Sequence, residues 1–204
     1  QKERFFMKKA FFTPATLARI AVLSAIASVL YFIPGIPIVP PIYKLDFSGV
    51  PVLLGGFAMG PVAALMIQLI KDLIGLTFTS SAGVGELADF LMTGSFALAA
   101  SLVYGRMKTR KGALLGMLLG IVAIVVMGAV TNLYIMIPFY MGAFSMTEEA
   151  IVGMIAGAIP MVDSMAKLIL LATVPFNLIK GVVLCAVTYL LYKPLSPLLH
   201  GKRS

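Results

Sequence analysis

Charged side chains are scarce in this chain. Only 12% of its 204 residues are charged, whereas about a quarter are charged in a typical soluble domain. Hydrophobic residues make up 60% of the sequence, which is more than a soluble domain of this size can bury. Several apolar runs approach the roughly 20 residues that cross a bilayer. The composition therefore predicts a protein embedded in a membrane.

Residues that build catalytic and metal sites are also few. The single histidine, His200, lies near the C-terminus, and the single cysteine, Cys185, lies in an apolar run. An internal disulfide is therefore impossible, and no cluster of His and Cys has metal-ligand spacing. The Gly-x-x-x-x-Gly-Lys-Ser/Thr motif of a P-loop is missing as well. We expect no metal site, no cofactor and no ATP hydrolysis by this chain.

The net charge of +8 does not predict a nucleic-acid partner, because the basic residues are in the wrong places for one. They gather in three clusters that flank apolar segments, as the cytoplasmic anchors of membrane helices do. These clusters are Lys2, Arg4, Lys8 and Lys9; Arg106, Lys108, Arg110 and Lys111; and Lys193, Lys202 and Arg203. The basic residues thus indicate the topology of the chain in the membrane.

Six membrane helices account best for this charge pattern. The apolar stretch 48–76 could be one tilted helix, but residues 106–111 would then lie on the opposite side from the N-terminus. A split at Gly60-Pro61 brings both basic clusters to one side. For the same reason we interpret 147–172 as an outer-face helix with re-entrant structure. The prediction is an all-α six-helix bundle in one domain, 1–204, with both termini cytoplasmic and helices at about 14–33, 48–59, 61–77, 86–105, 112–138 and 174–192.

Polar residues inside apolar runs are candidates for a ligand site. Asn177 and Lys180 are three residues apart at the start of the last predicted helix, so they share a face, with Lys180 about 7–8 Å deep. Lys180 could instead snorkel outward or pair with Asp163 or Asp46. Asn132, at similar depth in the fifth helix, could contact a ligand or form an interhelical hydrogen bond.

A further polar segment, 43–48, follows the Pro-rich connection 34–41, which cannot be regular helix. Asp46 or Ser48 can cap the next helix, and the stiff connection could also close over a pocket. All these polar elements fall on the same predicted side of the membrane. An uncharged, amphipathic, planar ligand would suit them better than an inorganic ion.

Four stretches carry a family resemblance. They are Leu-Ser-Ala-Ile-Ala in the first predicted helix, Leu-Asp-Phe-Ser-Gly-Val-Pro (45–51), Phe-Ala-Met-Gly-Pro-Val-Ala (57–63) and Pro-Phe-Asn-Leu-Ile-Lys-Gly (175–181). These stretches resemble the substrate-binding S components of energy-coupling-factor (ECF) vitamin transporters, in particular the riboflavin-specific branch. The resemblance covers most of the chain and is weak in 141–172.

The resemblance implies a protein that captures riboflavin at the outer face of a bacterial plasma membrane and releases it inward, without covalent chemistry. It implies two kinds of partner: a transmembrane coupling protein and a pair of ATPase subunits. The residues it assigns are Asn132, Asn177 and Lys180 as flavin ligands, Tyr43, Leu45, Asp46 and Phe47 as the lid, and Ala21 and Ala25 as the docking surface for the coupling protein. Asp89, where relatives often carry Asn, is a further candidate contact to the ribityl chain.

Three alternatives stay open at the level of sequence. The same architecture could carry another vitamin, such as thiamine, pantothenate or a folate. A small intramembrane enzyme could use Glu86, Asp89 and Lys180 on a lipid-linked substrate, although Glu86 and Asp89 also suit a simple helix start. A purely structural membrane subunit is the last alternative.

Overall fold

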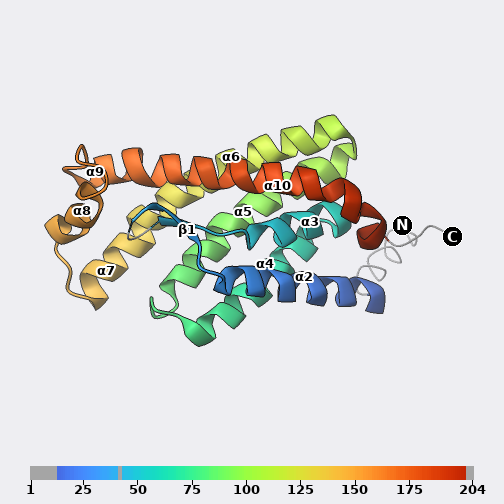
Figure 1. The fold of residues 1–204 in the computed structure, drawn as a ribbon, viewed down its shortest axis with the longest axis horizontal. Coiled ribbons are helices and arrows are strands. Elements are labelled where there is room, and N and C mark those ends of the chain that lie inside the picture. The colour runs from blue at the N-terminus through green and yellow to red at the C-terminus, as the bar shows by residue number, and fades with distance from the viewer. Residues whose placement is uncertain (1–12, 41–42, 201–204) are drawn as a thin grey trace, which may run out of the picture.

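The computed structural model of the protein describes residues 13–40 and 43–200. Most of them are helical, and the long helices run roughly along the long axis of the molecule (Figure 1). The predicted basic residues at positions 2–9 and 202–203 lie outside the described residues.

The first helix, α2 (Pro14–Phe32), begins as its sequence predicts. Thr13 is the N-cap, and its hydroxyl accepts a hydrogen bond of 3.2 Å from the backbone N–H of Thr16. Pro14 occupies the first helical position, where a missing N–H costs nothing. The helix ends before the Pro-rich connection, in agreement with the restriction that proline places on the residue before it.

The Pro-rich connection folds into a hairpin that the sequence analysis did not predict. Strand β1 (Ile36–Val39) pairs in an antiparallel manner with β2 (Tyr43–Leu45). Pro37 lies in β1. Proline is tolerated there because β1 pairs with one strand only, so a residue whose N–H would face away from that strand needs no hydrogen bond within the sheet. The hairpin leads directly into α3.

The break between α3 (Gly49–Met59) and α4 (Pro61–Gly75) lies at the predicted Gly60-Pro61 pair. Gly60 has a φ of +99°, a backbone conformation that side chains disfavour, and Pro61 then starts the next helix. A short 3-10 turn, η1 (Leu76–Phe78), ends α4, and α5 (Val84–Met107) follows.

The second half of the chain contains two π-helical turns, each followed closely by a proline. Pro138 and Pro175 are each the second residue of the helix after such a turn. A π-turn changes the local hydrogen bonding, so the helix accommodates a proline that would otherwise break it. The elements are α6 (Arg110–Thr131), η2 (Asn132–Met136), α7 (Ile137–Ala143), α8 (Glu148–Ala156), α9 (Met165–Leu168), η3 (Ile169–Thr173) and α10 (Val174–His200).

The last helix therefore starts earlier than the sequence analysis placed it. We expected a start at 174 because Pro175 suits a first turn, but helical structure runs without interruption from Met165. Lys180 consequently lies about 22 Å along this helical run, and not 7–8 Å from its start. Part of the segment 147–172, interpreted as outer-face and re-entrant structure, belongs to this helix.

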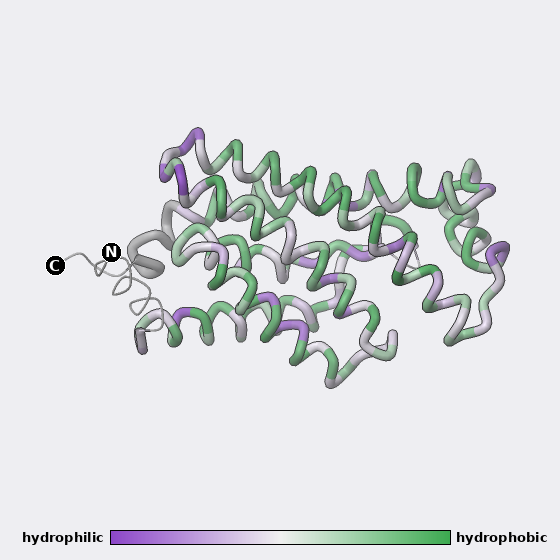
Figure 2. The backbone as a smooth tube through the Cα atoms, turned by 180° about the vertical axis from the view of Figure 1, so that it is seen from behind, coloured by the Kyte–Doolittle hydropathy of each residue, from purple (hydrophilic) through white to green (hydrophobic). Residues whose placement is uncertain are grey.

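Among the described residues, five helical runs are long and apolar enough to cross a membrane. They are Pro14–Phe32, Pro61–Phe78, Val84–Met107, Arg110–Ala143 and Met165–Tyr192; Gly49–Met59 is apolar but shorter. Their outer surfaces carry exposed apolar side chains such as Val22, Leu118 and Leu190. Figure 2 shows hydrophobic residues along most of each helix and hydrophilic ones at the turns and in a few stretches inside the bundle. The chain is therefore a multi-pass membrane protein.

Different elements of the chain lie at the two ends of the bundle. The start of α2, the turn between α5 and α6 and the end of α10 lie together at one end, on the right in Figure 1. The hairpin, α7, α8 and α9 lie at the other end. The basic turn 106–111 thus shares an end with the start of α2, as the split at Gly60-Pro61 requires.

Candidate functional site

A cavity of about 450 Å³ lies beneath the hairpin, within the usual volume range of small-molecule sites. Its walls come from the end of α2, the hairpin, the loop before α5, and the helices α5, η2 and α10. The apolar side chains that line it are Phe32, Met92, Met136 and Phe176. Polar residues also line it, and five of them were predicted as ligand contacts.

These five residues are Tyr43, Asp46, Asp89, Asn132 and Lys180. They come from the hairpin, the loop that follows it and three different helical segments, so only the tertiary structure brings them together.

Three other predicted contacts lie outside this lining within the described part of the chain. Leu45 is buried in the hairpin, and Phe47 packs against the main hydrophobic core. Asn177 is only 1% exposed and lies behind the wall. Leu45 and Phe47 therefore hold the hairpin and the loop after it against the protein interior. A ligand in the cavity would have to penetrate the wall to contact Asn177.

The hairpin is closed over the cavity by Tyr43. Its hydroxyl lies 2.6 Å from the hydroxyl of Thr173 and donates to Oδ1 of Asn132 over 3.3 Å. Its ring packs on Phe176 with 4.9 Å between the ring centroids. Burial raises the pKa of Tyr43, so this hydroxyl stays protonated and can donate.

The two π-turns explain where these partners lie. Asn132 is the first residue of η2 and Thr173 is the last residue of η3. Turns of this type frequently occur at functional sites because they redirect the side chains around them. One tyrosine of the hairpin thus docks onto both irregular turns of the bundle.

Lys180 of α10 lies between two carboxylates. Its Nζ atom is 3.2 Å from Oδ1 of Asp89 and 3.3 Å from Oδ2 of Asp46. Of the two alternative partners considered for Lys180, Asp46 is the one present, whereas Asp163 pairs with Lys167. Burial by itself would raise the pKa of Asp46, but Lys180, the hydrogen bond from Ser48 and Lys71 together lower it, so the net pKa is below its ordinary value and the pair is ionised.

Asp89 is the centre of a buried polar network that reaches α4. It accepts hydrogen bonds from Thr93 (2.9 Å) and Gln68 (3.1 Å), and it forms an ion pair with Lys71. Lys71 also pairs with Asp72 at 2.8 Å. Charges this deep are stable only when paired and hydrogen-bonded, and this network provides both.

The sequence analysis did not single out Lys71 and Asp72. The signal that could have identified them is their position inside an apolar run, where ionisable residues are rare and usually functional. The same signal did identify Lys180. Asp46 was one of the partners considered for Lys180, whereas Asp89, which lies in a different helix and also pairs with Lys71, was not.

Glu86 organises the opposite wall of the cavity. Its carboxylate accepts hydrogen bonds from Tyr31 (3.2 Å), Thr79 (2.8 Å) and Ser81 (3.3 Å). These contacts fix the loop before α5 against the end of α2. Asp89 lies one helical turn away but its carboxylate is held by Lys71 and Lys180, so the two acids have separate partners.

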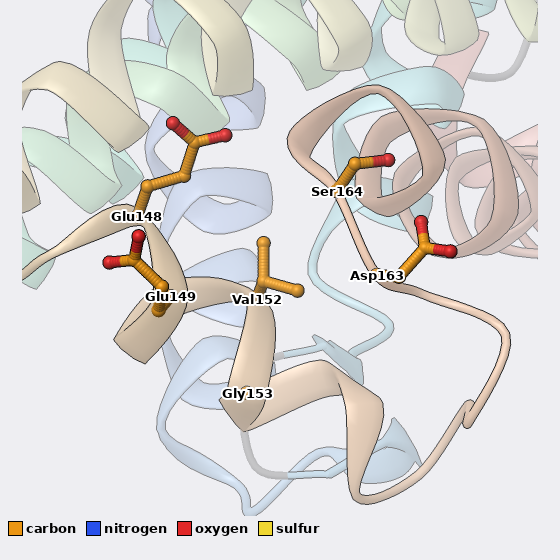
Figure 3. A pocket seen from close by; sticks show the side chains of 6 residues that line it. All are labelled: Glu148, Glu149, Val152, Gly153, Asp163 and Ser164. Atoms are coloured by element: carbon orange, nitrogen blue, oxygen red, sulfur yellow. The ribbon is translucent and has the colours of Figure 1, made fainter.

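A second hollow of about 320 Å³ lies at the same end of the molecule as the hairpin, between α8 and the start of α9. Figure 3 shows Glu148, Glu149 and Asp163 spread around it, with Val152 between them. Asp163 forms an exposed ion pair of 2.5 Å with Lys167. No group of three or more His, Cys, Asp or Glu in the described residues is placed to hold a metal ion. The cavity beneath the hairpin is the larger of the two and is lined by residues of several helices, so it is the better candidate for a ligand site.

The lining of the cavity is suited to binding a flat molecule with polar edges. Aromatic and methionine side chains can cover the faces of a flat ring system. Lys180, Asn132 and Tyr43 present hydrogen-bonding groups towards its edges.

Comparison with known proteins gives a consistent picture. A family described as "ECF transporter, substrate-specific component" matches residues 15–192 of this chain. The curated protein "Riboflavin transporter RibU" of Staphylococcus aureus (strain TCH60) is 35% identical over 181 residues, which cover 88% of this chain and 89% of that protein. "Riboflavin transporter FmnP" of Bacillus subtilis (strain 168) is 29% identical over 196 residues, or 92% of this chain and 95% of that protein.

One solved structure shares the fold as well as the sequence. It is described as "Structure and mechanism of the S component of a bacterial ECF transporter" and superimposes with a TM-score of 0.71. Its sequence is 34% identical, and the match covers 92% of this chain and 98% of that one.

Proposed function

This chain belongs to the substrate-specific components of ECF transporters, and we propose that it captures riboflavin in the cavity beneath its hairpin for import across the membrane. Its curated relatives are transporters and not enzymes. Riboflavin is then the transported substrate and not a cofactor. The comparisons favour this function over an intramembrane enzyme or a purely structural subunit.

The single observation that carries the proposal is that Tyr43, Asn132 and Lys180 converge on one cavity beneath the hairpin. The ring of Tyr43 and its neighbour Phe176 supply an aromatic surface, while Lys180 and Asn132 supply hydrogen-bonding groups. An isoalloxazine ring is planar, aromatic and polar along its edges, so it matches both features. The ribityl hydroxyls would find partners near Asp89 and Asp46.

Asn177 has a role that depends on the lid. In the closed arrangement Tyr43 contacts Thr173, whose carbonyl oxygen also accepts a hydrogen bond of 2.9 Å from the amide of Asn177. We infer that a flavin enters and reaches Asn177 while Tyr43 is withdrawn, and that Tyr43 then returns to Thr173 and holds the hairpin over the bound ring. Buried Leu45 and Phe47, which packs against the main core, would anchor the C-terminal end of the moving segment.

We further propose six crossings with both termini in the cytoplasm of a bacterial cell. The sixth helix is α3, whose eleven residues span about 17 Å and are buried from Gly49 to Phe57 by neighbouring helices. Such a short helix can lie in a membrane because protein, and not lipid, surrounds it. The basic turn 106–111 and the end of α10 then share the cytoplasmic side.

The partners we propose are one transmembrane coupling protein and two ATPase subunits, since this chain has no P-loop of its own. Ala21 and Ala25 of α2 are exposed and one turn apart. Small residues at this spacing allow another helix to approach closely within lipid. They are the candidate docking surface for the coupling protein.

The test is spectroscopic. Protein purified in mild detergent should be yellow, with flavin absorbance and quenched flavin fluorescence, and denaturation should release one riboflavin per chain. Thermal-shift measurements with thiamine, pantothenate and folate distinguish the other vitamins. A colourless preparation that also fails to bind added riboflavin would contradict the proposal.

A further inference from the structure

Asn177 is held in an unusual environment for a side-chain amide. It is 1% exposed, and its Nδ2 atom donates 2.9 Å to the carbonyl oxygen of Thr173, one turn earlier in the same helical run. Its Oδ1 atom has no hydrogen-bond partner within the described residues. A buried acceptor without a partner is unfavourable unless a ligand or water donates to it.

The amide of Asn177 rests directly against Gly128 of α6. A Cβ atom at position 128 would lie 2.7 Å from Cγ and 3.1 Å from Oδ1 of Asn177, and closer still to Nδ2. The three nearest atoms to such a Cβ all belong to this one amide. Any side chain at position 128 would therefore displace Asn177 before it touched anything else.

Gly128 also fixes the second predicted asparagine. Its carbonyl oxygen accepts a hydrogen bond of 2.8 Å from Nδ2 of Asn132, four residues later. That bond turns Oδ1 of Asn132 towards the hydroxyl of Tyr43. One glycine thus contacts the side chains of both asparagines, one through its carbonyl group and one through its missing side chain.

We propose that Gly128 is a positioning residue for flavin binding, because the absence of a side chain at this position sets where the Asn177 amide lies relative to Asn132. This inference rests on the proposed function. It adds a residue that touches no ligand itself and that neither composition nor the predicted polar contacts singled out.

The first experiment compares two glycine substitutions on the same helix. Gly128→Ala should weaken riboflavin binding about tenfold or more, as expected when a hydrogen bond to a buried polar group is misplaced. Gly120→Ala is the matched control. A Cβ atom there would lie 2.8 Å from Cδ2 and 2.9 Å from the carbonyl oxygen of Phe96, so it disturbs helix packing without touching either asparagine. Riboflavin titration monitored by fluorescence quenching gives both affinities.

A double-mutant cycle separates positioning from a general packing defect. If Gly128→Ala acts through Asn177, it should have little further effect on affinity in an Asn177→Ala background. The absorption bands of bound flavin should shift alike in Gly128→Ala and Asn177→Ala, and stay as in the wild type in Gly120→Ala. Unchanged affinity in Gly128→Ala, equal losses in both backgrounds, or an equal loss in Gly120→Ala would each overturn the proposal.

The folding of the variants also tests whether Gly128 acts through Asn177. If Gly128→Ala alone is too unstable to purify, Gly128→Ala with Asn177→Ala should restore a folded protein, because the obstructing amide is gone. Failure of that double variant to fold would also overturn the proposal. Failure of the wild-type protein to bind riboflavin would instead contradict the proposed function, so the two outcomes are distinguishable.

Discussion

The hydroxyl oxygen of Tyr43 lies 2.6 Å from that of Thr173, although 130 residues separate them in the chain. This contact joins the hairpin to the π-turn that precedes α10. The lid is therefore held shut by a hydrogen bond to a structural irregularity of the bundle, as well as by the ring contact with Phe176.

Tyr43→Phe should loosen the lid while leaving its ring in place. Loss of hydrogen bonds to Thr173 and Asn132 costs about 1 kcal/mol each, so we expect riboflavin to dissociate at least fivefold faster. Stopped-flow fluorescence measures this rate. Tyr104→Phe is the control, since it removes a hydroxyl that bonds Tyr192 away from the cavity. Equal dissociation rates in Tyr43→Phe and wild type would contradict a latch role.

Lys71→Met should destabilise the bundle by about 3–5 kcal/mol, because Asp72 and Asp89 would lose a buried cation. Adding Asp72→Asn should recover part of that loss by removing one of the uncompensated charges. Thermal unfolding in detergent reports both changes. Lys167→Met is the matched control, since its ion pair with Asp163 is exposed and worth little. A Lys71→Met protein as stable as the control would show that the network does not stabilise the fold.

Pro175→Ala should separate stability from binding. Alanine restores an N–H and permits a regular α-helix where η3 now ends. We expect unchanged or higher thermal stability together with weaker riboflavin binding, because Thr173 and Asn177 would shift with the turn. Isothermal titration checks the affinity. Pro61→Ala, at a helix start far along the chain from both π-turns, should leave affinity unchanged.

Ala21→Leu with Ala25→Leu should abolish uptake and leave riboflavin affinity intact. Two larger side chains on this exposed stripe would keep the coupling protein from approaching. Uptake of labelled riboflavin in cells that contain the whole transporter tests transport, and titration of the purified chain tests binding. Val29→Leu, on an exposed position of the same helix, serves as the control. Normal uptake by the double variant would remove this docking surface.

Much of the architecture follows from local properties of the sequence. Low charge and long apolar runs identify a membrane protein because lipid-facing helices need apolar residues along their whole length. The N-cap at Thr13 and the break at Gly60-Pro61 are likewise local, since capping and proline act within one turn. The break was predicted, and both features are present in the structure.

The start of the last helix could not be predicted from the residues next to it. Pro175 satisfies the rules for a helix start, yet it lies inside a continuous helical run. The π-turn that accommodates it is part of a packed region that includes Ala172 and Phe176. Several elements build this packed region, so the sequence next to Pro175 does not predict the π-turn.

The sequence by itself determined that this protein lies in a membrane, where most of its helices run, and which family it resembles. Only the tertiary structure decided that Lys180 pairs with Asp46 and Asp89, that Lys71 completes the network, and that Asn177 lies against Gly128 behind the cavity wall. The physical reason is distance along the chain. Propensity and hydropathy act within a few residues, whereas each of these contacts joins different helices or loops, and its geometry exists only once they have packed.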